Sequence, residues 1–121
     1  MSKKILIVED QEDNRRILRD LLSNAGFTIV EAINGKEGVD KAESEAPDLI
    51  LMDIQLPKIN GYEATRLIKA LPKLGQVPII AVTSYALSGD ETKARDAGCD
   101  GYITKPFSPR EMLATVHKFL E

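Results

Sequence analysis

Five short runs of apolar residues constrain the fold more than any other feature of the sequence. Spaced fairly evenly along the chain, they are Ile5–Val8, Thr28–Val30, Leu49–Met52, Ile79–Val82 and Tyr102–Ile103. Unbroken runs that are rich in β-branched residues are typical of strands buried on both faces of a parallel sheet. The sequence therefore predicts a parallel sheet with five strands.

Helical patterns lie between these runs. The first pattern has an apolar stripe that we expect to face the core, formed by Ile17, Leu18, Leu21, Leu22 and Ala25. Gly26 follows the stripe, where a glycine commonly ends a helix. Four polar residues, each with a glutamate three positions later, predict the starts of the other helices: Asn34, Asn60, Ser88 and Ser108.

The alternation of strand and helix, repeated five times, predicts an α/β fold. Right-handed crossovers place helices on both faces of a parallel sheet. We expect a doubly wound, flavodoxin-like sheet with strand order 2-1-3-4-5, formed by a single domain over residues 1–121. In such sheets the ligand site lies beyond the carboxyl ends of the strands, between the first and third.

Composition excludes several classes of protein. The formal net charge is -3, so the chain has no basic field that would attract nucleic acid or an anionic membrane. The apolar start, Ile5–Val8, is too short for a secretory signal or a membrane span. Cys99 is the only cysteine, which excludes an internal disulfide and suits a reducing compartment. We therefore expect a cytoplasmic protein.

Reactive side chains stand where the predicted strands end. They are Glu9 and Asp10 after the first strand, Asp53 after the third, Thr83 and Ser84 after the fourth, and Lys105 after the fifth. Three neighbouring carboxylates repel one another unless a cation is present, and Mg²⁺ prefers oxygen ligands. A lysine suits a phosphoryl oxygen, and a carboxylate can be the nucleophile that forms an aspartyl phosphate. The set predicts a phosphoryl-transfer site with bound Mg²⁺.

Other ligands and reactions are less compatible with the sequence. The turn after the first strand, residues 10–14, has no phosphate-binding glycines and is acidic, which argues against a nucleotide or a flavin. We expect His117, the single histidine, to lie on the last helix, far from the strand ends. Taken alone, Asp10 and Asp13 could equally cap the first helix.

Four segments carry a resemblance to a known family. They are residues 5–10, 48–61, 78–84 and 98–107, each containing one of the strand ends described above. Together they resemble response-regulator receiver domains, the fold of the bacterial chemotaxis regulator, over essentially the whole length of the chain.

The resemblance implies a role for each site residue. Asp53 would be phosphorylated, and Lys105 would pair with a phosphoryl oxygen. Asp10 and Asp53 would bind Mg²⁺ directly, Glu9 would do so through water, and the carbonyl of Gln55 would be a further ligand.

The resemblance also implies a conformational switch. Thr83 would move toward the phosphoryl group, and Tyr102 would turn inward to fill the vacated space. The face formed by the fourth helix, fifth strand and fifth helix would then bind a downstream protein. The Lys105–Pro106 peptide bond would be cis, and Tyr85 would influence the lifetime of the phosphate.

The function implied is that of a phosphorylation-activated response regulator in a two-component phosphorelay. A histidine kinase or histidine phosphotransfer protein would be the donor, and output would occur by protein binding because no output domain is expected. The chain looks most like stand-alone regulators of bacterial cell division and differentiation. A receiver module of a hybrid histidine kinase or larger regulator is the alternative.

Two other functional classes remain to be compared with this one. Small Mg²⁺-dependent phosphatases also use an aspartyl nucleophile, but they usually carry a second aspartate two positions later, where this chain has Gln55. We therefore expect no enzyme activity beyond self-phosphorylation and slow self-dephosphorylation. A domain that has kept the fold but lost the phosphorylation chemistry would not need the complete set of site residues.

Overall fold

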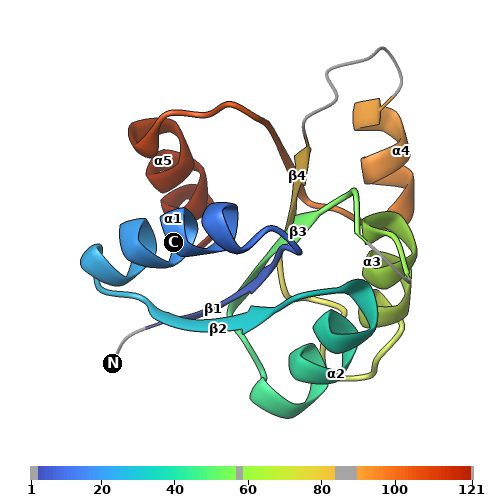
Figure 1. Ribbon diagram of the computed structural model, residues 1–121. Coiled ribbons are helices and arrows are strands. Elements are labelled where there is room, and N and C mark those ends of the chain that lie inside the picture. Colours follow the sequence, from blue (N-terminus) through green and yellow to red (C-terminus); the bar gives the residue numbers. More distant parts are fainter. Residues whose placement is uncertain (1–2, 57–58, 84–89, 121) are drawn as a thin grey trace.

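The computed structural model describes residues 3–56, 59–83 and 90–120. Five strands alternate with five helices along these residues (Figure 1). The strands are β1 (Lys4–Val8), β2 (Thr28–Ala32), β3 (Leu49–Asp53), β4 (Ile79–Thr83) and β5 (Gly101–Thr104). The helices are α1 (Glu12–Asn24), α2 (Gly35–Glu45), α3 (Gly61–Lys69), α4 (Asp90–Ala97) and α5 (Pro109–Leu120).

All strand pairs are parallel, and the order in the sheet is β2-β1-β3-β4-β5. The predicted doubly wound α/β fold and its strand order are therefore confirmed. Pairing of β1 with β3 aligns Val8 with Met52, so the ends of these two strands lie side by side. This pairing brings together residues that are more than forty positions apart in sequence.

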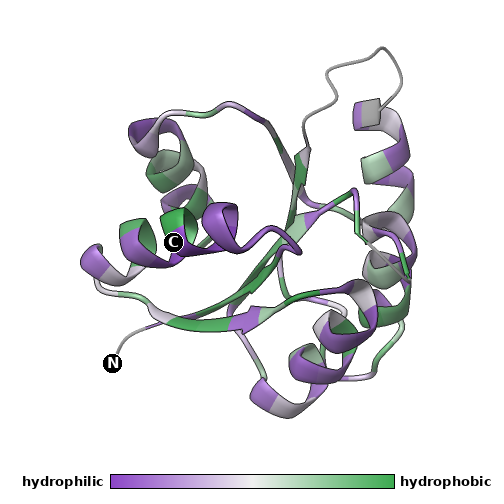
Figure 2. Ribbon diagram, viewed as in Figure 1, coloured by the Kyte–Doolittle hydropathy of each residue, from purple (hydrophilic) through white to green (hydrophobic). Residues whose placement is uncertain are grey.

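Helices cover both faces of the sheet, with α1 and α5 on one face and α2, α3 and α4 on the other (Figure 1). Successive side chains of a strand point to opposite faces. Along β1, Ile5 and Ile7 accordingly pack with α1 and α5, whereas Leu6 and Val8 pack with α2, α3 and α4. This two-sided burial explains why the strands have unbroken apolar sequences, which appear in green in Figure 2.

Three of the four predicted helix starts lie in the described residues and are confirmed. Asn34 Oδ1 accepts a hydrogen bond from the Glu37 N–H at 2.8 Å, and Asn60 Oδ1 accepts one from the Glu63 N–H at 2.9 Å. Ser108 Oγ accepts from the Glu111 N–H at 3.0 Å. The fourth predicted cap, Ser88, lies outside the described residues, as do Pro57, Ser84 and Tyr85.

The predicted apolar stripe of α1 is only partly correct. Leu18 and Leu22 are buried and Leu21 is half-buried, but Ile17 is 58% exposed and Ala25 is also exposed. The helix ends as predicted, with Gly26 at a φ of 99° directly after the C-cap residue Ala25. Ile17 is exposed because it borders a groove between α1 and the segment before α5 rather than the closed core.

None of the helices in the described part of the chain is both long and apolar enough to cross a membrane.

Candidate functional site

Three carboxylates meet at the carboxyl edge of the sheet, as the sequence predicted. Glu9 and Asp10 follow β1, and Asp53 is the last residue of β3. One oxygen from each side chain lies within 4.8 Å of the others. Glu9 is 1% exposed and Asp53 is 6% exposed, whereas Asp10 is half-buried.

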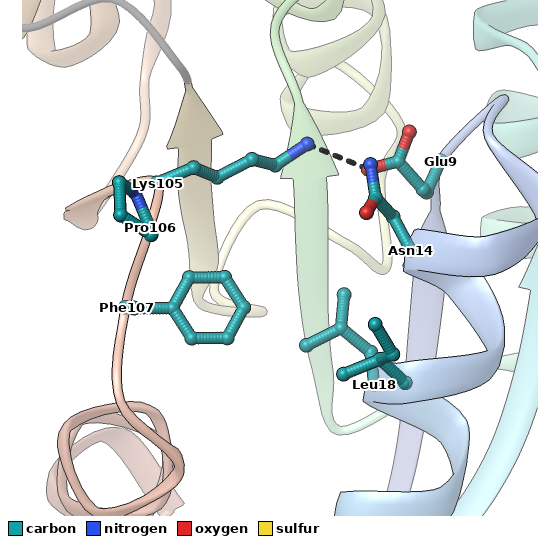
Figure 3. Close-up of a pocket in the computed structure, with 7 residues that line it drawn as sticks. Glu9, Asn14, Leu18, Lys105, Pro106 and Phe107 are labelled. Atoms are coloured by element: carbon teal, nitrogen blue, oxygen red, sulfur yellow. Dashed lines mark hydrogen bonds and ion pairs between the residues drawn. The ribbon is translucent and has the colours of Figure 1, made fainter.

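Lys105 extends from the segment after β5 into this cluster, as Figure 3 shows. Its Nζ lies 2.7 Å from Glu9 Oε1 and 3.4 Å from Asp53 Oδ2. The backbone places the lysine firmly, because the Lys105 N–H donates to the Thr83 carbonyl at 2.7 Å. The Lys105–Pro106 peptide bond is cis, which confirms that prediction.

The electrostatics of the cluster are those of crowded acids. Burial, followed by the proximity of Asp53, raises the pKa of Glu9 above its ordinary value, although the bond from Lys105 acts in the opposite direction. Burial and the neighbouring Glu9 likewise raise the pKa of Asp10. Burial acts to lower the pKa of Lys105, but its bonds and charge interactions with Glu9 and Asp53 outweigh this effect and raise it.

A divalent cation fits this arrangement. Within the described ranges, Lys105 is the only cation that forms an ion pair with a member of this cluster, and it pairs with Glu9 and Asp53 but not with Asp10. One positive charge therefore faces three carboxylates. Buried or partly buried carboxylates without enough positive charge are costly to ionise. Carboxylate oxygens are ligands that Mg²⁺ prefers. The donor set therefore suits Mg²⁺, with Glu9, Asp10 and Asp53 as its protein carboxylates.

The start of the segment after β3 is organised around Asp53. Asp53 Oδ1 accepts a hydrogen bond from the Gln55 N–H at 3.0 Å, and the Ile54 N–H donates to the Val82 carbonyl at 3.2 Å. The other oxygen of Asp53 faces Lys105. Gln55 is exposed, two residues beyond the carboxylate.

Thr83 and Tyr102 occupy neighbouring strands beside the cluster. Thr83 ends β4 and is 1% exposed. Tyr102 lies in β5 opposite Ala81 and is half-buried against the core on the α2–α4 side of the sheet. Thr83 and Tyr102 thus lie on β4 and β5, the strands that precede α4 and α5 in the chain.

The alternative role of Asp10 and Asp13 as helix caps is wrong. The N-cap residue of α1 is Gln11, and its side chain makes no capping hydrogen bond. Asp10 is instead available to the acidic cluster. His117 lies in the last turn of α5 with its ring centroid 5.6 Å from that of Phe27, away from the cluster, as expected.

Sequence reasoning missed one residue that holds the site. Arg15 Nη1 donates to the Glu9 carbonyl at 3.1 Å, and Arg15 Nε donates to Glu31 Oε1 at 3.0 Å. The guanidinium group therefore links the end of β1 to the edge strand β2. The only feature of the sequence that could have indicated this role is the position of Arg15 one turn into α1. An arginine at that position is equally compatible with a solvated surface residue.

The second feature missed is an apolar groove that opens next to Lys105. It has a volume of about 470 Å³ and is lined by Glu9, Asn14, Ile17, Leu18, Lys105, Pro106 and Phe107. Figure 3 shows Phe107 and Leu18 facing each other below the Lys105–Glu9 pair. The groove lies between α1 and the segment before α5, and Glu9 of the acidic cluster lines it together with Lys105.

Comparison with known proteins gives consistent results. A family model described as "Response regulator receiver domain" matches residues 5–117. The polar-differentiation response regulator DivK of Brucella anthropi is 43% identical over 120 residues, which cover 99% of this chain and 98% of that protein. DivK of Brucella ovis is 42% identical with the same coverage.

Solved structures agree with this result. The receiver domain of a sensor histidine kinase from Pseudomonas aeruginosa, with a magnesium ion coordinated in its active-site cleft, has a TM-score of 0.93 and 36% identity. The alignment covers 99% of this chain and 98% of that one. The Vibrio cholerae chemotaxis protein CheY4 has a TM-score of 0.95 and 26% identity, with coverage of 99% and 100%.

Proposed function

The chain belongs to the response regulator receiver family, and on this premise we propose that Asp53 is the residue that accepts the phosphoryl group. The protein is a phosphorylation-activated signalling protein, and not an enzyme that turns over a substrate. Its phosphodonor is a histidine kinase or a protein of the same relay. The observation that carries the proposal is the buried carboxylate of Asp53, which lies within 4.8 Å of two other acids and 3.4 Å from the Lys105 ammonium group.

Mg²⁺ would be held by Asp10 and Asp53, by Glu9 through water and by the carbonyl of Gln55. When bound, the ion would neutralise charge on the carboxylates and on the incoming phosphoryl oxygens. The crowded acids with raised pKa values support this set of ligands.

The chain's own residues then perform the transfer. A carboxylate oxygen of Asp53 attacks the phosphorus of a phosphohistidine in line, the P–N bond breaks, and an acyl phosphate forms. Lys105 stabilises the negative charge of a phosphoryl oxygen, since its ammonium group already lies between Glu9 and Asp53. Glu9 contributes by holding Lys105 at 2.7 Å, in reach of the reacting atoms.

The groove beside Lys105 would receive the phosphodonor. An exposed apolar side chain, Ile17, borders it together with Phe107 and Leu18, while Lys105 and Glu9 form its inner end. A donor helix with an apolar stripe could cover this groove and present its phosphohistidine to Asp53.

Output would depend on the strands that lie next to the site. The phosphoryl group would attract the hydroxyl of Thr83, and Tyr102 would repack into the space it leaves. The face formed by α4, β5 and α5 would thereby shift between two arrangements that bind a downstream protein with different affinity. The phosphoryl group can shift that equilibrium only by interacting differently with the two states.

The similarity to DivK supports a role as a single receiver domain, residues 1–121, acting in the cytoplasm in control of cell division or differentiation. The similarity to the receiver of a Pseudomonas aeruginosa histidine kinase favours a second possibility, a receiver module within a larger kinase. Both proposals share the same phosphorylation chemistry at Asp53.

Replacing the proposed acceptor tests this function. Asp53→Asn keeps the shape of the side chain but removes the nucleophilic carboxylate, so we expect no hydroxylamine-labile phosphate on the variant after incubation with Mg²⁺ and a labelled phosphohistidine donor. Asp13→Asn, an exposed acid on α1, is the control and should be labelled like the wild type. Label that persists on Asp53→Asn would reject the assignment.

A further inference from the structure

The segment between β3 and α3 begins directly after Asp53 and carries Gln55, and hydrogen bonds fix both of its ends. The Ile54 N–H donates to the Val82 carbonyl at 3.2 Å, and the Gly61 N–H donates to the Ile54 carbonyl at 3.0 Å. These bonds hold the start of the segment against β4 and close it onto the start of α3. Neither of these two bonds involves Ile59, which lies two residues before Gly61.

A close backbone contact holds Ile59 against α2. A Cβ atom added to Gly35, the first residue of α2, would lie 2.9 Å from the carbonyl carbon of Ile59 and 3.0 Å from its Cβ. It would lie still closer to the Ile59 carbonyl oxygen. Real Cβ atoms essentially never make contacts below 3.0 Å, so only a glycine at position 35 allows Ile59 to lie this close to α2.

The contact, and not the backbone conformation, requires this glycine. The φ of Gly35 lies outside the left-handed region, so a residue with a side chain could adopt the same backbone conformation. Glycine is a poor helix former, which makes its place at the buried start of α2 unfavourable for the helix itself. This unfavourable helix propensity is offset by the close approach of Ile59 that the glycine allows.

We propose that Gly35 is a positioning residue, which seats Ile59 on α2 and thereby sets the affinity of the acidic site for Mg²⁺. The inference rests on the proposed role of Asp53 and Gln55 as ligands.

Gly61, two residues after Ile59, lies directly against the end of β3, since an added Cβ there would lie 2.7 Å from Ile54 Cα and 3.0 Å from the Asp53 carbonyl carbon. A shift of Ile59 can therefore reach Asp53 through Asn60 and Gly61. Mg²⁺ requires near-ideal octahedral geometry with oxygens at about 2.0–2.1 Å, so a small displacement of Asp53 weakens its binding. Residues that orient metal ligands without touching the metal commonly change its affinity about 10- to 100-fold.

Gly35→Ala tests the proposal through Mg²⁺ binding, measured by NMR titration of the folded protein with Mg²⁺ alone. We expect its dissociation constant to rise about tenfold or more, the range seen for residues that orient metal ligands. Ala42→Gly is the matched control, because it removes a buried methyl group from the same helix without adding an atom near Ile59. This control should lower stability in urea yet bind Mg²⁺ like the wild type.

A second control adds a Cβ elsewhere. Gly75→Ala meets only the Lys69 carbonyl oxygen, at an ordinary 3.6 Å, and should leave Mg²⁺ affinity unchanged. If Gly35→Ala does not fold, Ile59→Gly tests the same position from the other side. It keeps the carbonyl but removes the Ile59 Cβ that lies beside Gly35, and it gives the backbone of residue 59 more conformational freedom, so it should also weaken Mg²⁺ binding.

The outcomes distinguish this inference from the proposed function. Wild-type affinity in Gly35→Ala, or in Ile59→Gly where that variant replaces it, would overturn the role of Gly35. An equal loss of Mg²⁺ affinity in Ala42→Gly would also overturn the role of Gly35, because general destabilisation of the protein would then explain the effect. If the wild-type protein itself binds no Mg²⁺, the proposed function fails and not this contact alone.

Discussion

At the scale of single residues, the pair formed by Lys105 and Glu9 is the shorter of the two ion pairs that Lys105 makes in the site. Glu9 is almost fully buried, and its Oε1 accepts a 2.7 Å bond from Lys105. Its Oε2 accepts the Gln11 N–H at 3.1 Å, so both carboxylate oxygens have partners. Lys105 thus partly balances charge that a divalent cation would balance more completely.

Removing the ammonium group should therefore destabilise the metal-free protein. Lys105→Met keeps much of the side-chain volume but leaves Glu9 buried without its cation, at a cost of roughly 1–3 kcal/mol in the free energy of unfolding. Urea unfolding at neutral pH measures this cost, and saturating Mg²⁺ should recover part of it. Lys4→Met, which breaks the exposed pair with Glu45, is the control and should change stability by less than about 0.5 kcal/mol. Equal stability of Lys105→Met and wild type would contradict this description of the pair.

The raised pKa values of Glu9 and Asp10 predict a pH dependence of Mg²⁺ binding. An acid whose pKa is raised by folding holds its proton more tightly in the folded state, so stability is lost as pH rises from the ordinary carboxylate range through the raised pKa. Mg²⁺ competes with these protons, and its binding should strengthen over the same pH range. Thermal unfolding with and without Mg²⁺ between pH 4.5 and 8 should show a stabilisation by Mg²⁺ that grows with pH. A stabilisation that is constant over this range would contradict the assignment of these acids as ligands.

At the scale of elements, much of the structure could be predicted because local patterns agreed with the fold. Apolar runs gave the strands, and Asn34, Asn60 and Ser108 gave three helix starts through bonds between residues three positions apart. The prediction failed for Ile17 in α1. Helical periodicity shows which side chains share a face, but it does not show whether a neighbouring helix covers all of that face.

The exposed Ile17 allows the proposed docking groove between α1 and the segment before α5 to be tested. Ile17→Glu places a charge at the border of the groove but disturbs no closed packing, since Ile17 is 58% exposed. We expect transfer from a phosphohistidine protein to slow by about tenfold or more, consistent with a loss of at least about 1.4 kcal/mol of docking energy. Phosphorylation by a small donor such as acetyl phosphate should be unchanged.

The matched control is Ile33→Glu, because Ile33 is also an exposed isoleucine, at 47%, but lies before α2 and outside the groove. It should leave both reactions unchanged. Equal slowing by the two variants would show that the groove has no special role in donor binding.

At the scale of the whole molecule, the strand order is what assembles the site. Residues 9, 53 and 105 come from three separate parts of the sequence, and they meet because β1, β3 and β4 lie next to one another with β5 at the edge. The rule that ligands bind at the carboxyl edge of a parallel sheet was enough to predict this meeting. Contacts between backbones, such as that of Gly35 with Ile59, could not be predicted because no local pattern in the sequence marks them.

An NMR titration of isotope-labelled protein, first with Mg²⁺ and then with beryllofluoride as a phosphate mimic, tests the central claim most directly. We predict that Mg²⁺ alone shifts the amide signals of Asp10, Asp53 and Gln55 in a saturable way. Beryllofluoride should then bind only in the presence of Mg²⁺ and should shift Thr83 and Tyr102. Absence of a saturable Mg²⁺ effect at residues 10, 53 and 55, or beryllofluoride binding that does not depend on Mg²⁺, would contradict the account.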